Sequence, residues 1–548
     1  MEITKKISIQ LFVFLLLVFG VSCLENSRNS EKMPPNILWL VCEDQWSDFF
    51  PMYGDSTVSL PNLEKLAGGG ITFDRAFATV PVCAPSRSAL MTGMYPTTLG
   101  THNMRTYNAW NAANLPEIGI PSYSPQVPEN VRCFTEYLRK AGYYCTNNAK
   151  EDYNFDTPLS AWDESSRDAH WRNRPEGRPF FSVFNFNITH ESRIWVNGDS
   201  TLLVNPASIQ IPPFFPQDSI ILHDFAVNYS NLIRMDHQIG IIIQQLKDDE
   251  LFNETIIFFY SDHGGPFPRY KRALYETGIK IPLIIRVIQN HDQSTRNDEM
   301  VSFIDFAPTV LSLAGIKPPD HMQGKAFLGE FKTSRTPTFV FTSADRFDET
   351  TDRVRAIRSE HYKYIRNFNP SKPHALPNKY RLNMPMMQRL QELHKNGNLD
   401  SLSSQWMADQ KPPEELYDLN SDPFELHNLA EKPEFQDTLQ MFRDRLEVWV
   451  METNDMGRFD EKDLLEMWLP GGVQPKLDPP QLVVEEDQLN ITTNMHDATI
   501  IWKYPSDNRW TIYDQPIQRS TTDTIQIKAV RIGYEDSDTI VSNNMIAP

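Results

Sequence analysis

Short runs of apolar residues in the first half of the chain predict the strands of a buried β-sheet. The clearest runs cover residues 36–42, 178–184 and 255–261. Strands that are apolar on both faces, without alternation, are typical of a parallel sheet that helices cover on each side. The pattern therefore favours an open α/β sheet in this part of the chain.

Two of these runs end in side chains that can bind a cation. The first run is followed by Glu43 and Asp44, and the last by Asp262 and His263. In an open α/β sheet, ligands bind beyond the carboxyl ends of the strands, so the two ends are expected to face one crevice. Carboxylate oxygens suit a hard divalent cation, and the imidazole offers a fourth ligand. The sequence therefore predicts a metal site formed by these four residues.

The second half of the chain alternates between apolar and polar residues, which predicts smaller antiparallel sheets. Residues 354–358 and 361–365 alternate like strands, as do short stretches after residue 481. The long segment 370–406 is expected to cover a cleft. A packing helix is predicted from apolar residues at helical spacing, namely Leu439, Phe442, Leu446 and Val450.

The window that starts at Cys83 predicts a helix with a cysteine at its beginning. Pro85 suits the first turn of a helix and no helix breaker follows before Met91, so Cys83 is expected at the helix N-terminus. Unpaired backbone N–H groups and the helix dipole favour an anion there. Arg87 lies one turn further on and can reach Cys83. The alternative is a surface helix with a free cysteine and a solvated arginine.

This window resembles the CxPSRxxxxTG signature of type I sulfatases. In that family a maturation enzyme oxidises the cysteine to formylglycine (3-oxoalanine), whose hydrated aldehyde supplies a geminal diol. The resemblance implies that Cys83 is converted in this way and that a formylglycine-generating maturation enzyme is a partner of the chain. It also implies an alkaline phosphatase-like α/β fold, with a large mixed, mostly parallel sheet flanked by helices and a small antiparallel-sheet C-terminal subdomain.

The resemblance assigns the acidic strand ends to a calcium site beside residue 83. Sulfatases carry an Asp-Asp pair after the first strand and an Asp-Asn or Asp-His pair later, which hold one calcium ion next to the formylglycine. Here Glu43 and Asp44 stand for the first pair, Asp262 and His263 stand for the second, and residue 83 itself is expected as a further ligand. Glu43 lengthens one ligand by a methylene group but keeps its charge. The histidine leaves open whether calcium or a softer ion is preferred.

Three further matches supply positive charge and a proton donor. Lys150 and Lys271 match the two sulfate-binding lysines of the family, although Ala149 replaces the glycine that usually precedes the first. His190 matches the histidine that contacts the ester oxygen. The family's Trp-His after the first lysine is Glu-Asp here, so that histidine's role cannot be transferred.

The implied mechanism uses the diol at position 83 as the nucleophile toward sulfur, polarised by calcium and Arg87. Lys150, Lys271 and the metal would stabilise the growing charge on the sulfuryl oxygens. His190 or Lys271 would protonate the leaving oxygen. The second hydroxyl of the diol would then expel sulfate.

Two residues near the Cys83 window, His102 and Arg105, are candidates for contacts with a sugar. A lone lysine, arginine or histidine is more often solvated or structural than functional. For these two, a substrate contact and a structural role are both open.

Composition restricts the class of partner. The formal net charge of −19 argues against a nucleic-acid binder and requires a locally basic cleft if the substrate is a polyanion. If Cys23 is removed or acylated and Cys83 is converted, only Cys42, Cys133 and Cys145 remain. They do not form a disulfide framework.

The N-terminus predicts export. Lys5 and Lys6 precede an apolar run over residues 7–21, which is short for a transmembrane span. Residues 20–23, Gly-Val-Ser-Cys, resemble a bacterial lipobox, so lipidation of Cys23 and simple cleavage are both open. The expected location is periplasmic or at the outer membrane or cell surface, and a lipid anchor would be the only membrane attachment.

The length of 548 residues suggests roughly three units. We expect a signal peptide at residues 1–23, a catalytic α/β domain at 35–330, a C-terminal subdomain at 331–470 and a β-sandwich accessory domain at 481–548. The last segment resembles the C-terminal β-sandwich of chitobiases and hexosaminidases, which favours a carbohydrate setting. A packing or spacer role is equally open.

Taken together, the resemblance implies an exported sulfatase that acts on a sulfated polysaccharide or its oligosaccharides, such as ulvan, carrageenan or a glycosaminoglycan. One alternative is a phosphonate or phosphate ester hydrolase of the same superfamily, which would share the strands and metal ligands. Another is a non-catalytic protein that binds sulfated glycans. The intact set of acidic residues, cysteine and arginine counts against that last alternative.

Overall fold

A computed structural model describes residues 33–107, 118–288, 294–334, 337–485, 488–518 and 524–542. The chain from Pro35 onward forms one compact unit. The predicted signal at residues 1–23, with Cys23, and the last residues of the predicted accessory domain lie outside the described residues. Within the described part, no helix has the length and apolar character needed to cross a bilayer.

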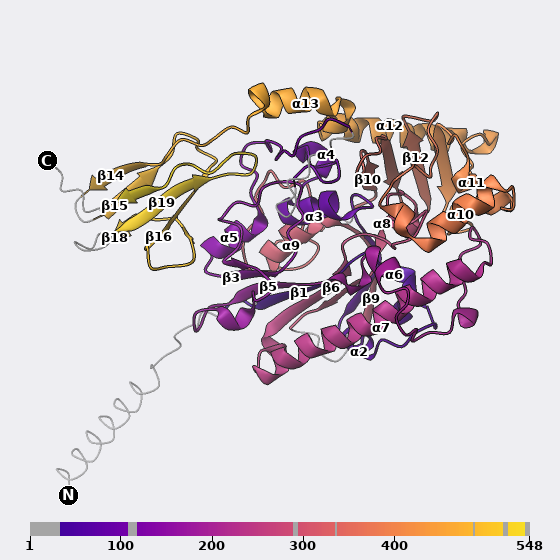
Figure 1. Cartoon of the computed structure of the whole chain (residues 1–548). Coiled ribbons are helices and arrows are strands. Elements are labelled where there is room, and N and C mark those ends of the chain that lie inside the picture. The colour runs from indigo at the N-terminus through magenta and orange to yellow at the C-terminus, as the bar shows by residue number, and fades with distance from the viewer. Residues whose placement is uncertain are drawn as a thin grey trace, which may run out of the picture. The chain divides into compact units, whose positions relative to one another are not determined.

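The largest sheet has a parallel centre and antiparallel strands toward one side (Figure 1). Its order is β4-β3-β5-β1-β6-β8-β2-β7, and β9 pairs with β2. β1 runs parallel to both β5 and β6, whereas β8 is antiparallel to β6 and β2. The strands are β1 (Asn36–Cys42), β2 (Ile71–Phe77), β3 (Tyr144–Asn148), β4 (Glu164–Ser165), β5 (Phe180–Phe186), β6 (Thr255–Ser261), β7 (Lys280–Ile281), β8 (Leu283–Arg286) and β9 (Thr295–Ser302). The three predicted apolar runs are β1, β5 and β6, which confirms the expected α/β class.

Helices cover both faces of this sheet, which is why β1 is buried along its whole length. Leu38 and Leu40 belong to the apolar cluster shared with α2 and α7, whereas Ile37, Trp39 and Val41 belong to the cluster shared with α3, α5 and α9. The helices of this region are α2 (Pro61–Gly68), α3 (Cys83–Thr92), α4 (Pro96–Leu99), α5 (Phe134–Lys140), α6 (Ser192–Val196), α7 (Ser219–Asp248), α8 (Glu276–Ile279) and α9 (Phe306–Leu313).

A second, antiparallel sheet follows in the order β10-β11-β12-β13. The predicted strands at 354–358 and 361–365 correspond to β11 and β12. The predicted packing helix is α12, but Trp449, stacked 5.1 Å from Phe341, is buried where Val450 was expected. The elements are β10 (Val340–Ala344), β11 (Val354–Arg358), β12 (Tyr362–Asn367), α10 (Pro385–Lys395), α11 (Ser401–Met407), β13 (Glu414–Asp418), α12 (Gln436–Glu452) and α13 (Glu461–Trp468).

The C-terminal residues form two small antiparallel sheets, ordered β14-β15-β18 and β17-β16-β19-β20. Leu489 and Ile491 of one sheet share an apolar core with Ile525 and Ile527 of the other. This is the packing of a β-sandwich. The strands are β14 (Gln481–Glu485), β15 (Gln488–Thr492), β16 (Thr499–Lys503), β17 (Thr511–Ile512), β18 (Ile517–Gln518), β19 (Ile525–Val530) and β20 (Ile540–Ser542). The domain boundaries expected from the sequence stay a prediction.

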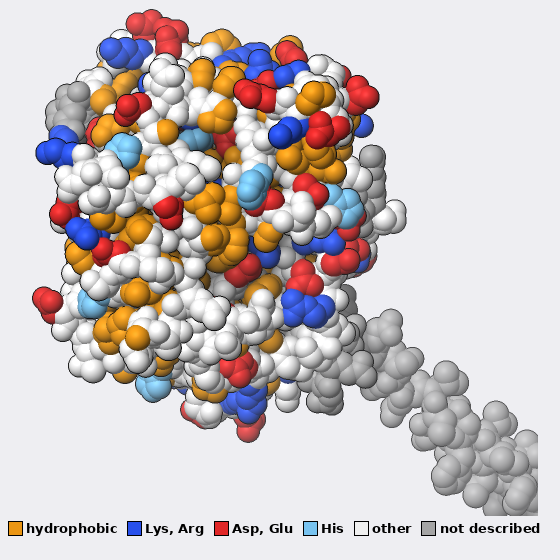
Figure 2. All heavy atoms as spheres, turned by 90° about the vertical axis from the view of Figure 1, so that its right-hand side faces the viewer, with side chains coloured by type: hydrophobic (Ala, Val, Ile, Leu, Met, Phe, Trp, Pro, Cys, Tyr) orange, Lys and Arg blue, Asp and Glu red, His pale blue; other side chains and the backbone are white. Residues whose placement is uncertain are grey.

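Figure 2 shows one face of the molecule, on which acidic and basic side chains lie interspersed among apolar ones. On this face the negative net charge of the chain is therefore not gathered into one patch.

Candidate active site

The predicted crevice is formed where β1 and β6 end side by side. The two strands pair in parallel, with Cys42 opposite Ser261. The residues that follow are held together, because the Asp44 N–H donates to Asp262 Oδ1 over 3.1 Å. The Gln45 N–H donates to Ser261 Oγ over 2.8 Å and ties the loop after β1 to β6. The expectation that these two strand ends meet is confirmed.

Helix α3 begins at Cys83, as predicted, and its first turn docks on the end of β6. Ser86 Oγ donates to the Asp262 carbonyl over 2.7 Å, and Arg87 Nε donates to Asp262 Oδ2 over 3.0 Å. Arg87 Nη1 also donates to Asn185 Oδ1 of β5 over 2.7 Å. These contacts fix the helix N-terminus, and with it Cys83, over the crevice.

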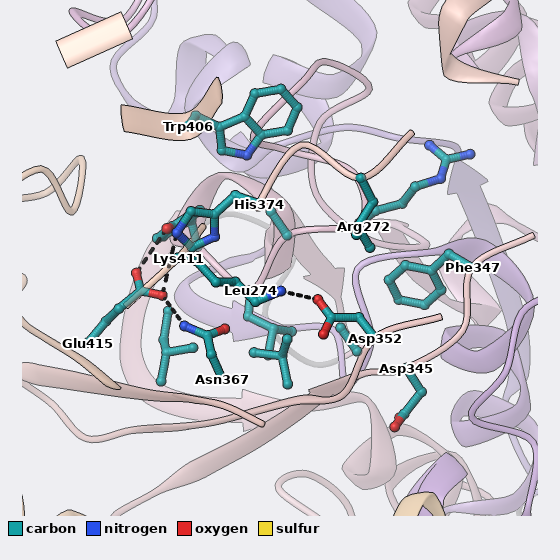
Figure 3. A pocket seen from close by; sticks show the side chains of 16 residues that line it. Arg272, Leu274, Asp345, Phe347, Asp352, Asn367, His374, Trp406, Lys411 and Glu415 are labelled. Atoms are coloured by element: carbon teal, nitrogen blue, oxygen red, sulfur yellow. Dashed lines mark hydrogen bonds and ion pairs between the residues drawn. The ribbon is translucent and has the colours of Figure 1, made fainter. Parts of the chain in front are cut away.

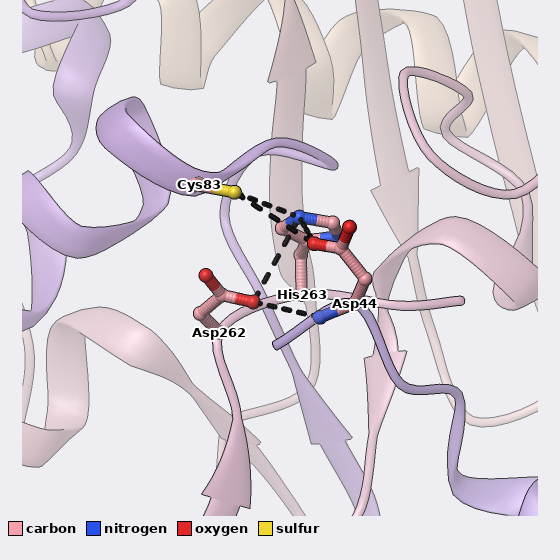
Figure 4. Close-up of side chains that lie close together, drawn as sticks. All are labelled: Asp44, Cys83, Asp262 and His263. Atoms are coloured by element: carbon pink, nitrogen blue, oxygen red, sulfur yellow. Dashed lines mark hydrogen bonds and ion pairs between the residues drawn. The ribbon is translucent and has the colours of Figure 1, made fainter. Parts of the chain in front are cut away.

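The Cys83 thiol points toward Asp44 and His263, which follow the ends of β1 and β6 (Figure 4). Its Sγ is 3.4 Å from His263 Nε2, 3.7 Å from Asp44 Oδ1 and 3.6 Å from Lys271 Nζ. Burial, and then the Asp262 carboxylate, raise the pKa of the Cys83 thiol well above its usual range. Because a thiol acts as a nucleophile through its thiolate, an unmodified cysteine is poorly suited to attack from this position.

Four of the predicted metal ligands can converge on one cation. Donor atoms of Asp44, Cys83, Asp262 and His263 lie within 4.8 Å of one another, and all four residues are buried. Although burial opposes ionisation, Arg87 brings the pKa of Asp262 to about 2, so this carboxylate is charged at neutral pH. Two buried carboxylates and an imidazole fit a divalent cation with a preference for oxygen ligands.

Glu43 is not one of these four residues, although it lies close to Cys83. Its Oε2 is 2.5 Å from Lys150 Nζ, and it forms a separate group with Cys83 and His190. Its Oε1 is buried without a hydrogen-bond partner in the part of the chain that is described. Lys150 is also 3.6 Å from Asp152 and is 22 % exposed. The structure thus places Glu43 as an anchor for Lys150, and its role as a metal ligand stays a prediction.

Lys271 is a buried cation that contacts both Asp44 and Cys83. Its Nζ is 2.7 Å from Asp44 Oδ2 and 3.1 Å from Glu191 Oε1. Arg272 donates two hydrogen bonds to Glu191, at 2.8 and 2.9 Å. Although burial opposes it, Asp44 raises the pKa of Lys271 well above its usual range, so the ammonium stays charged. Sequence reasoning missed Glu191 and Arg272, although each directly follows a predicted residue.

His190 lies beside Lys271 with a side chain that is 17 % exposed. Its Nε2 is 3.5 Å from Lys271 Nζ, and its Nδ1 accepts the Ser192 N–H over 3.2 Å. Because Nδ1 is an acceptor, we assign the ring proton of the neutral form to Nε2, which faces the site. Burial, and then Lys271, lower the pKa of His190, so the ring is neutral at pH 7.

The predicted sugar contact His102 lies in different surroundings. The residue is 2 % exposed, and burial lowers its pKa despite the nearby charges of Asp345 and Asp455. It belongs to a buried ion cluster around Arg355, which donates to both carboxylates over 2.9 Å. We therefore leave His102 out of the proposed substrate contacts.

Arg105, the other predicted sugar contact, lies nearer the site. Its guanidinium is 5.0 Å above the ring of Tyr380, and that ring is 6.4 Å from the ring of His190. Its Nη1 is 3.2 Å from Asp348 Oδ1. Sequence reasoning did not single out Tyr380 or Asp348, because they come from segments far along the chain that carry no local signal.

A second polar cavity, of about 50 Å³, is lined by Arg272 and by residues of the small sheet (Figure 3). Its charges are already paired within the protein. Lys411 Nζ contacts Asp352, and Glu415 accepts hydrogen bonds from Asn367 over 2.6 Å and from Tyr275 over 2.9 Å. The residues that line it do not include Cys83. We therefore interpret this cavity as part of the packing between the two sheets.

Comparison with known families agrees with this geometry. The profile of the sulfatase family matches residues 35–176 and 146–316. The chain belongs to the sulfatase family. A profile for the C-terminal region of N-sulphoglucosamine sulphohydrolase matches residues 266–394. This sulfatase is therefore a sulfuric ester hydrolase, and its large mixed sheet is the alkaline phosphatase-like fold predicted from the sequence.

Two curated relatives match the sulfatase over most of its length. An ulvan-active sulfatase from Formosa agariphila is 40 % identical over 583 residues, which cover 97 % of each chain. The human N-sulphoglucosamine sulphohydrolase is 25 % identical over 512 residues, which cover 84 % of this chain and 97 % of the relative.

A solved structure shows the same fold at lower identity. A protein in complex with its substrate D-glucosamine-2-N,6-O-disulfate superposes with a TM-score of 0.55 and 16 % identity. The match covers 77 % of this chain and 98 % of that protein.

Proposed function

We propose that this sulfatase releases sulfate from a sulfated polysaccharide or its oligosaccharides, through a formylglycine formed at Cys83. The observation that carries the proposal is the position of Cys83 at the start of α3, 3.6 Å from Lys271 Nζ and within the four-residue metal-ligand group. The 40 % identical relative, an ulvan-active sulfatase, supports an algal polysaccharide as the substrate.

Conversion of Cys83 accounts for the chemistry of its surroundings. The pKa of the buried thiol is raised, so a thiolate would be disfavoured exactly where a nucleophile is needed. The hydrate of formylglycine supplies one hydroxyl for attack on sulfur and a second through which sulfate is released. Conversion requires a formylglycine-generating enzyme as a partner during synthesis.

The metal-ligand group would hold one divalent cation, for which we propose calcium because two carboxylates and the oxygen of a formylglycine at residue 83 would supply three oxygen ligands of four. Asp44, Asp262, His263 and residue 83 are the proposed ligands. When bound, the ion supplies a Lewis acid beside the sulfate ester. Arg87 holds the Asp262 carboxylate in place through its other oxygen, since Nε donates to Oδ2 over 3.0 Å while Oδ1 accepts the Asp44 N–H.

Lys150 and Lys271 are proposed to bind the sulfuryl oxygens. Burial opposes the charge of both ammonium groups, but neighbouring carboxylates outweigh it, since Glu43 raises the pKa of Lys150 and Asp44 raises that of Lys271. Cations that are already in position stabilise the charge that develops in the transition state without having to reorganise.

His190 is the proposed donor to the leaving oxygen. Its neutral ring carries the proton on Nε2, on the side of Lys271. The neutral Nε2–H can donate a hydrogen bond to the departing oxygen. The charged ammonium of Lys271, 3.5 Å away, can supply the proton that this oxygen takes up.

The test uses protein produced together with a formylglycine-generating enzyme. Mass spectrometry of the peptide that contains residue 83 gives the extent of conversion, and free sulfate is assayed on ulvan oligosaccharides and on a phosphate ester analogue. We expect converted protein to release sulfate and Cys83→Ala to release none while still binding the oligosaccharide. Turnover by a form that retains an ordinary cysteine would refute the proposal, and faster turnover of the phosphate ester would support the alternative hydrolase.

We also propose that the protein is exported. Lys5 and Lys6, the apolar run over residues 7–21 and Cys23 support a signal peptide with a possible lipid attachment. Secretion of the full chain and mass analysis of the mature N-terminus would separate lipidation of Cys23 from simple cleavage. A mature protein that retains residues 1–22 would contradict export by this route.

A further inference from the structure

Arg105 is the site's cation with the greatest access to solvent. Its side chain is 34 % exposed, whereas those of Arg87 and Arg272 are 5 % exposed and that of Lys271 is 1 % exposed. The buried cations face carboxylates and Cys83. A guanidinium that remains partly open can instead meet a group that arrives from outside.

Aromatic rings connect Arg105 to the proposed leaving-group donor. The guanidinium lies 5.0 Å above the ring of Tyr380, which is 6.4 Å from the ring of His190 and 5.3 Å from that of Trp195. His190 in turn is 3.5 Å from Lys271 Nζ. Stacking on a ring fixes the plane of a guanidinium and leaves its edges free to donate.

Charged groups connect Arg105 to Lys271 by a second route. Asp348 is 3.2 Å from Arg105 Nη1 and 3.5 Å from Arg272 Nη2, so one carboxylate faces two guanidinium groups. Arg272 is paired with Glu191, which is 3.1 Å from Lys271 Nζ. Because the Asp348 carboxylate is shared by two guanidinium groups, it does not fully neutralise the charge of Arg105.

The backbone holds these residues in an unusual conformation. Arg105 has φ of 60°, Asp348 of 52° and Arg272 of 73°, all in the left-handed region that non-glycine residues rarely adopt. The Arg105 N–H donates to Asn154 Oδ1 over 3.1 Å, and the Asn154 amide donates to the Thr101 carbonyl over 2.8 Å. Strained residues of this kind concentrate at functional sites, where the surroundings enforce their position.

We infer that Arg105, seated on Tyr380, binds a second anionic group of the sulfated sugar and makes the enzyme selective for substrates that carry one. The inference rests on the proposed sulfatase function. The free edge of a guanidinium can bind a carboxylate or a sulfate through two parallel hydrogen bonds. The partner is therefore either the carboxylate of a neighbouring uronic acid or a second sulfate.

The test compares substrates in pairs. One pair is a sulfated disaccharide with an adjacent uronic acid and its carboxyl-reduced counterpart. The other is a disulfated disaccharide and its monosulfated counterpart. Sulfate release is measured as kcat/KM, corrected for formylglycine content, for the wild type, Arg105→Ala, Arg105→Lys and a control, Arg458→Ala. Arg458 is a comparable arginine, 4.8 Å above Phe459, in the C-terminal part of the chain.

We expect Arg105→Ala to lower kcat/KM about 10- to 100-fold on the member with the second anion. This is the size of effect expected when hydrogen bonds between charged groups are lost. On the member of each pair that lacks the second anion, we expect kcat/KM to change by less than about threefold. Arg105→Lys keeps a positive charge beside Asp348 but cannot form two parallel hydrogen bonds. Its kcat/KM on the member with the second anion should therefore lie between those of Arg105→Ala and the wild type. Arg458→Ala should match the wild type. A loss confined to the first pair identifies the carboxylate, and one confined to the second identifies a second sulfate.

Equal losses on both members of both pairs, or no loss on any, would overturn the inference and leave the sulfatase function intact. Converted wild type that releases sulfate from no member would overturn the proposed substrate class and the inference with it. Affinity provides a second readout in case Arg105→Ala is unstable. Calorimetry compares Cys83→Ala with the double variant Cys83→Ala, Arg105→Lys. The double variant should bind the members that carry a second anion more weakly, and the other members equally well.

Discussion

Lys271 and Lys363 are two buried lysines that have nearly the same charged neighbours. The Nζ of Lys271 is 2.7 Å from Asp44 and 3.1 Å from Glu191. The Nζ of Lys363, on β12, is 2.8 Å from Glu276 and 2.7 Å from Glu425. Their side chains are 1 % and 0 % exposed. Burial and pairing with two carboxylates therefore do not distinguish the lysine that we propose binds sulfate from one with a structural role.

The difference lies in the third hydrogen of each ammonium group. Lys363 Nζ donates to the Leu274 carbonyl over 3.1 Å, so with Glu276 and Glu425 this ammonium group has three protein oxygens within 3.1 Å. Beyond Asp44 and Glu191, Lys271 Nζ faces Cys83 Sγ at 3.6 Å, which is a weak acceptor, and His190 Nε2 at 3.5 Å, which carries the ring proton and does not accept. Lys271 thus keeps one donor for an incoming oxygen. A lysine is predicted to act on substrate where the protein leaves part of its hydrogen-bonding capacity unused.

The largest effect is expected from removing that unused donor. Lys271→Ala should lower kcat for sulfate release by about 10²- to 10³-fold, the scale of losing one positioned donor to a developing anion. Steady-state kinetics on converted protein measure it, with Lys476→Ala, an exposed lysine paired with Asp538, as control. A kcat within a few-fold of the wild type would mean that the sulfate binds elsewhere.

Lys363→Met should instead act on stability. Removing one partner of a buried ion pair leaves an uncompensated charge and costs about 3–5 kcal/mol, here from Glu276 and Glu425. Thermal unfolding should show a clearly lower midpoint, while kcat per folded molecule stays near the wild-type value at low temperature. If kcat falls with the midpoint unchanged, the distinction between the two lysines is wrong.

The contrast between the two lysines also shows what the sequence could predict. β1, β5, β6 and the start of α3 follow from local patterns, because an apolar run or a proline acts within a few residues. The positions of Asp44 and Asp262 follow from the pairing of β1 with β6, since parallel strands end at the same edge of a sheet. The strands and the helix start needed local patterns alone, and the meeting of Asp44 with Asp262 needed in addition the general rule that ligands bind at the carboxyl ends of strands in an open α/β sheet.

Other features depend on contacts between distant segments. Glu191, Asp348 and Tyr380 reach the site from three separate segments, and the pairing of Glu43 with Lys150 joins residues more than one hundred positions apart. The antiparallel strands β7 and β8 of the large sheet are too short to show a pattern. Side-chain pairing of this kind is decided by tertiary packing, which no local pattern encodes.

A more exposed cation tests whether position or burial matters for catalysis. Lys150 is 22 % exposed and anchored by Glu43, so Lys150→Ala should lower kcat/KM by about 10²-fold, at the lower end of the range for a positioned donor. Glu43→Gln should leave Lys150 in the site but weaken its anchoring contact, so we expect a smaller loss of kcat/KM than for Lys150→Ala. Equal kcat/KM for Lys150→Ala and the wild type would confine sulfate binding to Lys271.

The smallest effect concerns the pH dependence of stability. Although burial opposes ionisation, Lys363 lowers the pKa of Glu276 from its ordinary value of 4.5 to about 2. A carboxyl whose pKa is depressed in the folded state stabilises the protein above its unfolded pKa, and this contribution disappears as the pH falls toward the folded value.

The difference in unfolding midpoint between the wild type and Lys363→Met should therefore be constant near pH 7 and narrow between about pH 4.5 and pH 2. Arg87→Met provides the counterpart at the site, since Arg87 lowers the pKa of Asp262 from 3.8 to about 2. The difference in unfolding midpoint between the wild type and Arg87→Met should therefore narrow between about pH 3.8 and pH 2. A gap that widens on acidification would contradict the assigned pairs. Because both gaps narrow in the same direction, acid unfolding should not separate the two regions, whereas turnover should, since Lys271 at the Cys83 site keeps a donor for a substrate oxygen.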